Sequence, residues 1–184
     1  MQTIKPVEYI EISENMFPIF LAWPIAWAWW WQEVATKYFK ENARNCKKQI
    51  IIIDPSRYII EWKSEKKFTP WYEYKFSRQR EWERHYLDAT ANNGWKILFW
   101  LPVQKEIIPN NPNWTQKKSY ASTTRQELWT AMIRYPDSVI VWIENNFPEW
   151  SIISDDFKFY TNNPDFPIYW SLEECCEEAV KLIR

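Results

Sequence analysis

Short runs of consecutive apolar residues recur along the chain and predict strands that are buried on both faces. The clearest run is Gln49–Asp54, which reads QIIIID and ends at Pro55. Unbroken runs of β-branched residues are typical of parallel sheets, in which helices cover both faces of each strand. The same pattern predicts further strands at 17–22, 96–101, 138–143 and 167–170.

Segments with apolar residues at helical spacing separate these strands. After the first strand, positions 31, 34, 35, 38 and 39 are apolar or aromatic, and this spacing predicts a helix over 31–45. Further helices are predicted at 72–93, 124–134 and 171–184.

Two of the predicted helices begin with a capping-box motif. These motifs are Thr124-x-x-Glu127 and Ser171-x-x-Glu174. In such a box the hydroxyl of the first residue and the carboxylate of the fourth accept hydrogen bonds from free N–H groups of the first turn. Each motif therefore predicts the residue at which its helix begins.

The alternation of strands and helices predicts a three-layer α/β domain. We expect a Rossmann- or flavodoxin-like parallel sheet of about five strands, with helices on both faces. Residues 1–184 fit a single domain, in which 1–16 form an N-terminal extension. The segments 56–70, 103–123 and 145–166 are predicted as loops. Ligands of such folds bind outside the carboxyl ends of the strands, so we expect the site there.

Composition excludes several classes of function. The net charge of −1 and the pI near 6.0 do not fit a protein that binds a nucleic-acid polymer through a basic surface. The 3 cysteines, two of them adjacent, do not form a disulfide framework, and 1 histidine without a C-x-x-C motif does not form a zinc site. The N-terminal residues do not resemble a signal peptide, and prolines interrupt the most apolar stretch, 18–31. We therefore expect a cytoplasmic protein that does not span a membrane.

Three segments form an ordered set of motifs. They are IFLAWPI at 19–25, QREWERHYLDA at 79–89 with ILFWLP at 97–102, and TTRQELW at 123–129. In this order and spacing, over residues 17–183, they resemble the nucleoside 2-deoxyribosyltransferase-like family. The corresponding family motifs are F-L-A-G-P-I, a helix with W-E followed by an I-L-F-W strand, and E-L-G at the start of a helix.

The resemblance implies both the chemistry and the residues of the site. Glu127, at the Glu of E-L-G, would be the nucleophile that attacks the anomeric carbon, and Asp88 would assist at the sugar or the base. The substrate would be a small-molecule nucleoside, deoxynucleoside or monophosphate, handled without a metal or an organic cofactor, and the protein would be a homo-oligomer. The residues implied in substrate binding are Ala22, Trp23, Pro24, Trp82, Thr123 and Thr124.

This chemistry gives the two carboxylates distinct tasks. Breaking an N-glycosidic bond develops positive charge at the sugar, which one carboxylate captures as a glycosyl-enzyme while a second group protonates the departing base. The chain lacks the family's other loop carboxylate, since residues 119–124 read SYASTT. The alternative is a Rossmann-like module that binds a nucleotide without turnover, with Glu127 serving only as a helix cap. Convergence of Glu127 and Asp88 on one cleft would distinguish the two.

Glycine and tryptophan are present in unusual numbers. The chain has 1 glycine and 15 tryptophans, whereas average usage gives about 13 glycines at this length. Trp23 and Trp129 stand where the family has glycine in A-G-P and E-L-G, and Trp142 lies where the fourth strand usually ends in glycine. Our hypothesis is that many of these tryptophans are glycines in the natural protein, read from UGA codons. UGG codons at positions 23 and 129 of the gene would contradict it.

Overall fold

The computed structural model describes residues 1–22, 30–56, 58–59, 67–68, 76–103 and 122–184. Its strands are β1 (Gln2–Ile4), β2 (Met16–Ala22), β3 (Gln49–Ile53), β4 (Tyr58–Ile59), β5 (Lys67–Phe68), β6 (Lys96–Leu101), β7 (Val139–Ile143) and β8 (Ile168–Tyr169). Its α-helices are α1 (Trp30–Asn42), α2 (Phe76–Asn92), α3 (Ser122–Arg134), α4 (Trp150–Tyr160) and α5 (Leu172–Val180). Short 3-10 helices cover Ala43–Asn45, Pro136–Ser138 and Lys181–Ile183.

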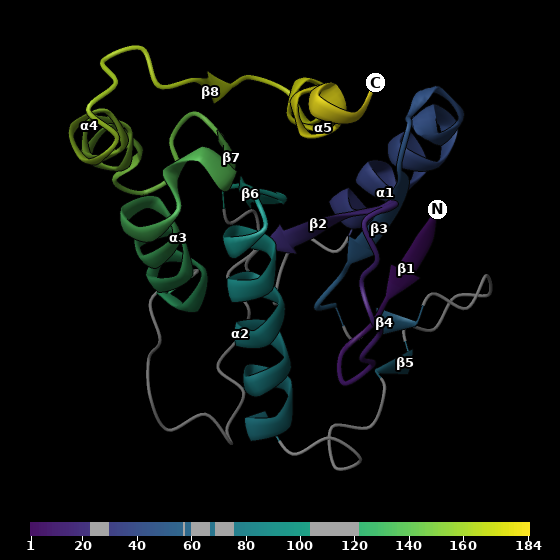
Figure 1. Ribbon diagram of the computed structural model, residues 1–184. Helices are drawn as coiled ribbons and strands as arrows, with labels where there is room; N and C mark the ends of the chain where they lie inside the picture. The colour runs from purple at the N-terminus through teal and green to yellow at the C-terminus, as the bar shows by residue number, and fades with distance from the viewer. Residues whose placement is uncertain (23–29, 57, 60–66, 69–75, 104–121) are drawn as a thin grey trace.

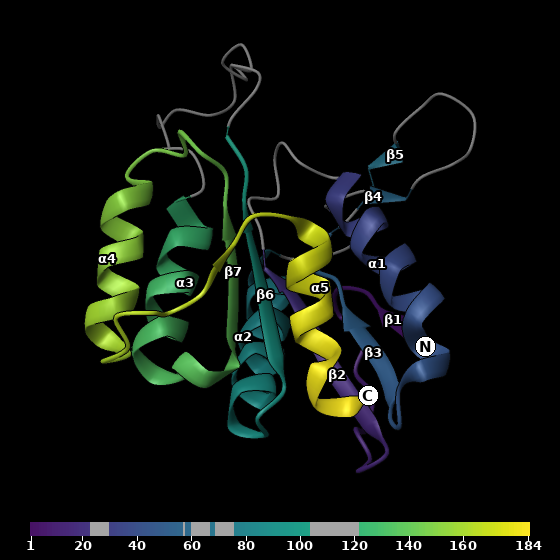
Figure 2. The ribbon, with the colours of Figure 1, turned by 90° about the horizontal axis from the view of Figure 1, so that it is seen from above.

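A parallel sheet of six strands forms the centre of the described structure, in the order β1-β3-β2-β6-β7-β8 (Figure 1). Helices α2, α3 and α4 cover one face of this sheet, and α1 and α5 cover the other (Figure 2). The prediction of a three-layer α/β fold with a parallel sheet is therefore confirmed, with six strands in place of about five. The two strands β4 and β5 form a separate antiparallel pair within a segment that we predicted as a loop.

The isoleucine run of β3 explains how one sheet supports two cores. Side chains of successive strand residues point to opposite faces. Ile51 and Ile53 pack into the cluster that contains Trp82 of α2, whereas Ile50 and Ile52 pack into the cluster that contains Trp31 of α1. All four isoleucines are fully buried, which is why the sequence shows no polar alternation here.

The N-terminal segment is part of the domain and not only an extension. β1 pairs in parallel with β3, with Thr3 opposite Ile52, and so adds an edge strand to the sheet. The strand was not predicted because three residues are too few to show a periodic pattern. The segment then crosses α2, where Nε1 of Trp82 donates a hydrogen bond to the backbone oxygen of Glu8 at 2.7 Å. The hydroxyl of Tyr86 accepts a hydrogen bond from the backbone N–H of Ile10 at 3.1 Å. These contacts fix α2 against the edge of the sheet.

Helix α4 contradicts the predicted loop over 145–166. Ile153 and Phe157, one turn apart, are buried against the sheet. The apolar residues Trp150, Ile152 and Phe159 are exposed on other sides of the same helix. Apolar residues on the exposed sides of α4 obscure the one-sided pattern on which helix prediction depends.

The two capping boxes have different outcomes. At α5 the box is confirmed, because Ser171 Oγ accepts from the N–H of Glu174 at 3.1 Å and the Glu174 carboxylate accepts from the N–H of Ser171 at 3.1 Å. At α3 the predicted box is wrong. The helix begins at Ser122, so Thr124 lies inside its first turn and is buried, and the carboxylate of Glu127 contacts a different helix.

The confirmed box predicts the cost of losing a cap. Ser171→Ala removes one acceptor of the first turn of α5, and we expect it to lower the free energy of unfolding by about 1 kcal/mol. Ser151→Ala, at an exposed position within α4, is the matched control and should change stability by less than half of that amount. Urea unfolding followed by circular dichroism measures both, and equal effects of the two substitutions would contradict the assignment.

Candidate functional site

The candidate site lies at the carboxyl edge of the sheet, where α2 and α3 begin. From β2 the chain moves to β3 on one side of the sheet, and then crosses to β6 on the other side of β2. Ligands of doubly wound sheets bind outside the carboxyl ends of the strands at such a reversal of strand order. Helices α2 and α3 lead into β6 and β7, and because all these strands are parallel, the first turns of both helices lie at this edge.

Two carboxylates from different helices meet at one guanidinium group there. Nη1 of Arg80 on α2 donates to Oε2 of Glu83, one turn further along the same helix, at 2.8 Å. The same nitrogen also donates a short hydrogen bond to Oε1 of Glu127 on α3. Because both oxygens bind one nitrogen, they lie no more than about 6 Å apart, which is two hydrogen-bond lengths.

The two carboxylates differ in exposure and in the number of hydrogen bonds they accept. The side chain of Glu83 is 5% exposed, and its second oxygen, Oε1, accepts from Nε2 of Gln79 at 2.7 Å. That same amide nitrogen donates to the backbone oxygen of Pro55 at 3.3 Å, which ties α2 to the end of β3. The side chain of Glu127 is 16% exposed, and within the described residues no hydrogen bond to its Oε2 is found. Glu127 is therefore the more accessible of the two.

Burial gives Glu127 an unusual affinity for a proton. Loss of solvent, the largest cause, and the negative charge of Glu83 both raise the pKa of its carboxyl, whereas the cations Arg80 and Arg84 lower it; the net result is a pKa of about 7 in place of the usual 4.5. Glu127 thus keeps its proton up to about pH 7. Below that pH the pair holds at least one proton, which the two neighbouring carboxylates share.

The structure does not bring Asp88 to Glu127. Asp88 is exposed on α2, eight residues after Arg80, which is about 12 Å along the helix axis. It is also five residues after Glu83, and so about 140° away around the helix. The convergence of Glu127 and Asp88 that would distinguish an enzyme from a binding module is therefore absent, and Glu83 occupies the place expected for the second carboxylate.

The predicted substrate-binding residues are dispersed. Trp82 is fully buried and packs edge-on against Tyr86, with ring centroids 5.1 Å apart, so its ring is part of the core and offers no face to a base. Ala22 is buried at the carboxyl end of β2, and Thr124 is buried within α3. Thr123 is exposed at the start of α3. Trp23 and Pro24 lie outside the described residues.

The sequence contained a signal for the residues that were missed. Gln79, Glu83, Tyr86 and Thr90 follow one another at three- or four-residue spacing on one side of α2, and all four are buried. Polar residues on the buried side of a helix require partners, because an unpaired buried polar group costs about 1–3 kcal/mol. Such residues are therefore candidates for a polar site, and their spacing could have singled out Glu83 in preference to Asp88.

A second polar cluster continues along the same edge. The ammonium group of Lys5 contacts Oδ2 of the buried Asp54 at 2.5 Å and Oγ of Ser56 at 3.0 Å. The N–H of Ser56 donates to Oδ1 of Asp54 at 2.8 Å. These contacts engage both oxygens of Asp54 in holding β1 and the end of β3 together, so a structural role accounts for this residue.

Two of the tryptophans that we compared with glycines, Trp129 and Trp142, lie among the described residues, and both are partly buried. Trp129 of α3 is half-buried and meets Tyr160 of α4 edge-on, with ring centroids 6.2 Å apart. Trp142 of β7 stacks on Trp100 of β6 at 3.8 Å. Among the described residues no tryptophan has a positive φ. Any glycine at these positions would therefore serve close packing and not a left-handed turn, and the substitution hypothesis stays a prediction.

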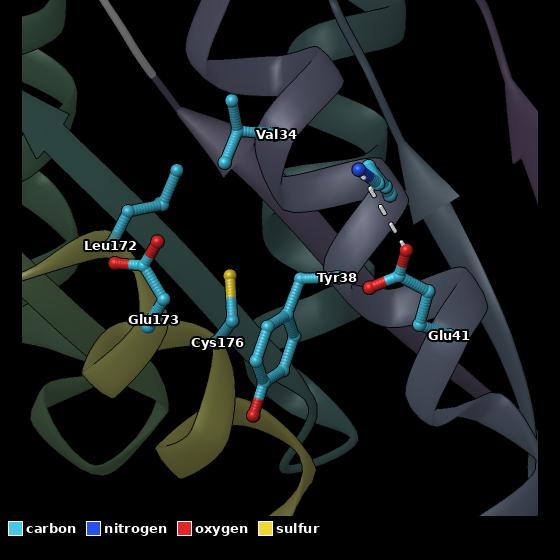
Figure 3. A pocket seen from close by; sticks show the side chains of 7 residues that line it. Val34, Tyr38, Glu41, Leu172, Glu173 and Cys176 are labelled. Carbon is cyan, nitrogen blue, oxygen red and sulfur yellow. Dashed lines mark ion pairs between the residues drawn. The ribbon is translucent and has the colours of Figure 1, made fainter.

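A hollow of about 250 Å³ lies between α1 and α5 (Figure 3). These helices cover the face of the sheet opposite to α3, which carries Glu127 (Figure 2). Val34, Tyr38 and Glu41 of α1 line one side of it, and residues 172, 173 and 176 of α5 line the other. Lys37 forms an ion pair with Glu41 there at 3.9 Å, between two exposed side chains. The hollow contains no member of the carboxylate pair and no buried charged group.

The described residues contain no group of three or more His, Cys, Asp or Glu side chains placed to hold a metal ion. Over the same residues, none of the helices has the length and apolar character needed to cross a bilayer.

Comparison with protein-family models gives no match, and comparison with curated proteins finds no similar sequence. The fold defines an α/β protein with Rossmann- or flavodoxin-like topology.

The proton affinity of Glu127 predicts how stability depends on pH. Its pKa is higher in the folded protein than the usual 4.5, so its contribution to stability is present below pH 4.5 and is lost as the pH rises through about 7. The amide of Glu127→Gln does not ionise, so this variant does not lose stability as the pH rises. Relative to the wild type, the variant should gain up to about 3 kcal/mol of unfolding free energy between pH 4.5 and pH 8.

Chemical denaturation at several pH values measures this difference. Glu81→Gln on α2 is the matched control, because Glu81 is exposed and its carboxylate stays in water in the folded protein. Its stability curve should run parallel to that of the wild type. A Glu127→Gln curve that is also parallel to the wild type would show that the carboxylate of Glu127 is not buried beside Glu83.

Proposed function

We propose that this protein breaks the N-glycosidic bond of a nucleoside, a deoxynucleoside or a nucleoside monophosphate through a covalent glycosyl-enzyme. Glu127 is the nucleophile and Glu83 is the acid/base. The observation that carries the proposal is the meeting of these two carboxylates, from α3 and α2, at one nitrogen of Arg80. The site lies at the carboxyl edge of the sheet, where folds of this kind bind their ligands.

The separation of the carboxylates supports a covalent mechanism. In retaining glycosidases the two carboxyl groups are about 5–5.5 Å apart, whereas inverting enzymes need about 6.5–9.5 Å to admit a water molecule between the carboxylate and the sugar. Two oxygens that bind the same nitrogen of Arg80 lie no more than about 6 Å apart, which is less than the separation that inverting enzymes need. One carboxylate is thus close enough to attack the sugar directly while the other reaches the leaving group.

Exposure and hydrogen bonding assign the roles. Glu127 is the more exposed of the two, and Arg80 occupies only one of its oxygens, which leaves Oε2 as the attacking atom. Both oxygens of Glu83 accept hydrogen bonds from α2 side chains, which hold its carboxyl group in one orientation. Each carboxyl oxygen has two lone pairs, so Glu83 can still carry the proton that the departing base requires.

The proton content of the pair is suited to the reaction. In the first step, Oε2 of Glu127 forms a bond to the anomeric carbon, the carbon–nitrogen bond breaks, and the bond's electron pair leaves with the base as Glu83 protonates it. The step requires one proton shared by the two carboxylates. The pKa of about 7 at Glu127 indicates that the pair holds such a proton near neutral pH. Water or an acceptor base then releases the sugar and returns the proton to Glu83.

The resemblance to the nucleoside 2-deoxyribosyltransferase-like family supports the choice of substrate. Glu127 lies in the ELW segment that corresponds to E-L-G, and Glu83 is the Glu of the W-E pair. The resemblance also supports a homo-oligomer. The free cysteines Cys46, Cys175 and Cys176 fit a reducing, cytoplasmic compartment.

A module that binds a nucleotide without turnover is the second candidate. The exposed position of Asp88, away from Glu127, favours it, because the carboxylate that the resemblance assigns to the sugar or base is not at the site. In such a module the Glu83–Arg80–Glu127 contacts would only hold α2 against α3. Turnover is the property that separates the two candidates.

A panel of nucleosides, deoxynucleosides and monophosphates tests the proposal, with and without a free acceptor base. Mass-resolved chromatography should detect base release or base exchange by the wild type, and Glu127→Ala should reduce the rate by about a thousandfold or more, as expected when a nucleophile is lost. Dependence on the acceptor base identifies a transferase, and release without acceptor identifies a hydrolase.

Two controls complete this test. Glu81→Gln, at an exposed position of α2, should retain full activity. The protein should also be made with Gly at positions 23 and 129, so that bulky rings at those positions do not decide the outcome. Binding of a nucleotide with no turnover by either form would establish the binding module and contradict the enzyme.

A further inference from the structure

Arg80 occupies a central position in the carboxylate pair. It comes from the second turn of α2, its side chain is 22% exposed, and one nitrogen, Nη1, donates to both Glu83 and Glu127. A guanidinium is planar and permanently charged, and its donors have a fixed geometry. A single rigid cation therefore contacts both the proposed nucleophile, Glu127, and the proposed acid/base, Glu83, at the same time.

The proposed reaction moves a negative charge from one of these carboxylates to the other. In the reactive form of the pair, the shared proton has moved from Glu127 to Glu83, so that Glu127 is the carboxylate and Glu83 is the acid. When Glu127 becomes a glycosyl ester it loses its charge, and Glu83 becomes the carboxylate because its proton has left with the base. The second half of the reaction reverses both changes. The pair carries one negative charge throughout, and only the position of that charge alternates.

We infer that Arg80 is a positioning residue that serves as the shared counter-ion of the two carboxylates and turns Oε2 of Glu127 toward the sugar. Because Nη1 contacts both groups, the guanidinium compensates the charge on Glu127 before the first step and on Glu83 after it, without having to move. Its hydrogen bond to Oε1 fixes the plane of the Glu127 carboxylate. This inference rests on the proposed function, but its electrostatic part can be measured in the protein without substrate.

The other charged groups near Glu127 do not replace Arg80. In the described residues the charges that act on Glu127 are those of Glu83, Arg80 and Arg84, all from α2. Arg84 is exposed, and its effect on the pKa of Glu127 is smaller than that of Arg80. Lys5, at the other end of the edge, is paired with Asp54.

The test compares the titration of Glu127 in four proteins: the wild type, Arg80→Gln, Arg80→Lys and Arg78→Gln. Carbon-13 labelling of the glutamate carboxyl groups allows the titration to be followed by NMR without substrate, and the signal of Glu127 is assigned by its absence from Glu127→Gln. Arg78→Gln is the matched control, because Arg78 is exposed on the same helix. The rates kcat and the constants KM for base release are measured in parallel.

Arg80→Gln should raise the titration midpoint of Glu127 by about 1–3 pH units, the usual effect of a neighbouring opposite charge. It should also lower kcat about a hundredfold, with little change in KM. Arg80→Lys keeps the charge without the planar geometry. The titration midpoint of Glu127 should therefore lie close to its wild-type value in this variant, whereas kcat should recover only in part. Glu83→Gln should move the midpoint in the opposite direction, because a like charge is removed. Arg78→Gln should leave both quantities as in the wild type.

An unchanged Glu127 midpoint in Arg80→Gln would overturn the inference, whatever the activity. Turnover by the wild type together with that result would leave the proposed function standing and remove only the role of Arg80. If the wild type turns over none of the panel but the midpoint moves as expected, the proposed function fails and the shared counter-ion is established as a feature of the fold. A purely structural ion pair would move the two midpoints in the same way, so a lower kcat at unchanged KM, partly restored by Arg80→Lys, is the result that separates the positioning role from it.

Discussion

The burial of two carboxylates against one guanidinium is the interaction on which this account depends. Two like charges in a poorly solvated place repel each other, and the protein accommodates them by supplying one cation and retaining one proton. Arg80 supplies the cation, and the pKa of about 7 at Glu127 reflects the proton. The same balance that makes the pair unfavourable for stability makes it suited to exchange a proton with a leaving group near neutral pH.

The fold fixes this pair through contacts made away from it. Helix α2 is held to the N-terminal segment by Trp82 and to the end of β3 by the amide of Gln79. Both contacts originate from residues adjacent to Arg80 or Glu83 in the helix. Helix α3 packs on the same face of the sheet through Leu128, the neighbour of Glu127. The two helices therefore present their carboxylates to each other because the core on that face sets their positions.

The sequence predicts the centre of this fold better than its margins. The isoleucine run of β3 and the helix predicted over 72–93 have strong local patterns, because strands buried on both faces and helices with one buried stripe leave regular periodicities. β1 is too short for a period, and α4 is apolar on several sides. At the site, the resemblance predicted Glu127 as nucleophile and Asp88 as its partner, but the structure places Glu83 and not Asp88 beside Glu127. Which carboxylate of α2 faces α3 depends on how the helices pack, and a family motif cannot supply that.

The most direct test of the account is to look for the sugar on Glu127. A nucleoside with fluorine at the 2-position of the sugar destabilises positive charge there and should slow release of the glycosyl-enzyme, so the intermediate accumulates. After quenching, peptide mass spectrometry should find the mass of the sugar on the peptide that contains Glu127, and not on that peptide from Glu127→Gln. Release of the base while the protein keeps its original mass, or a sugar attached elsewhere, would contradict the account.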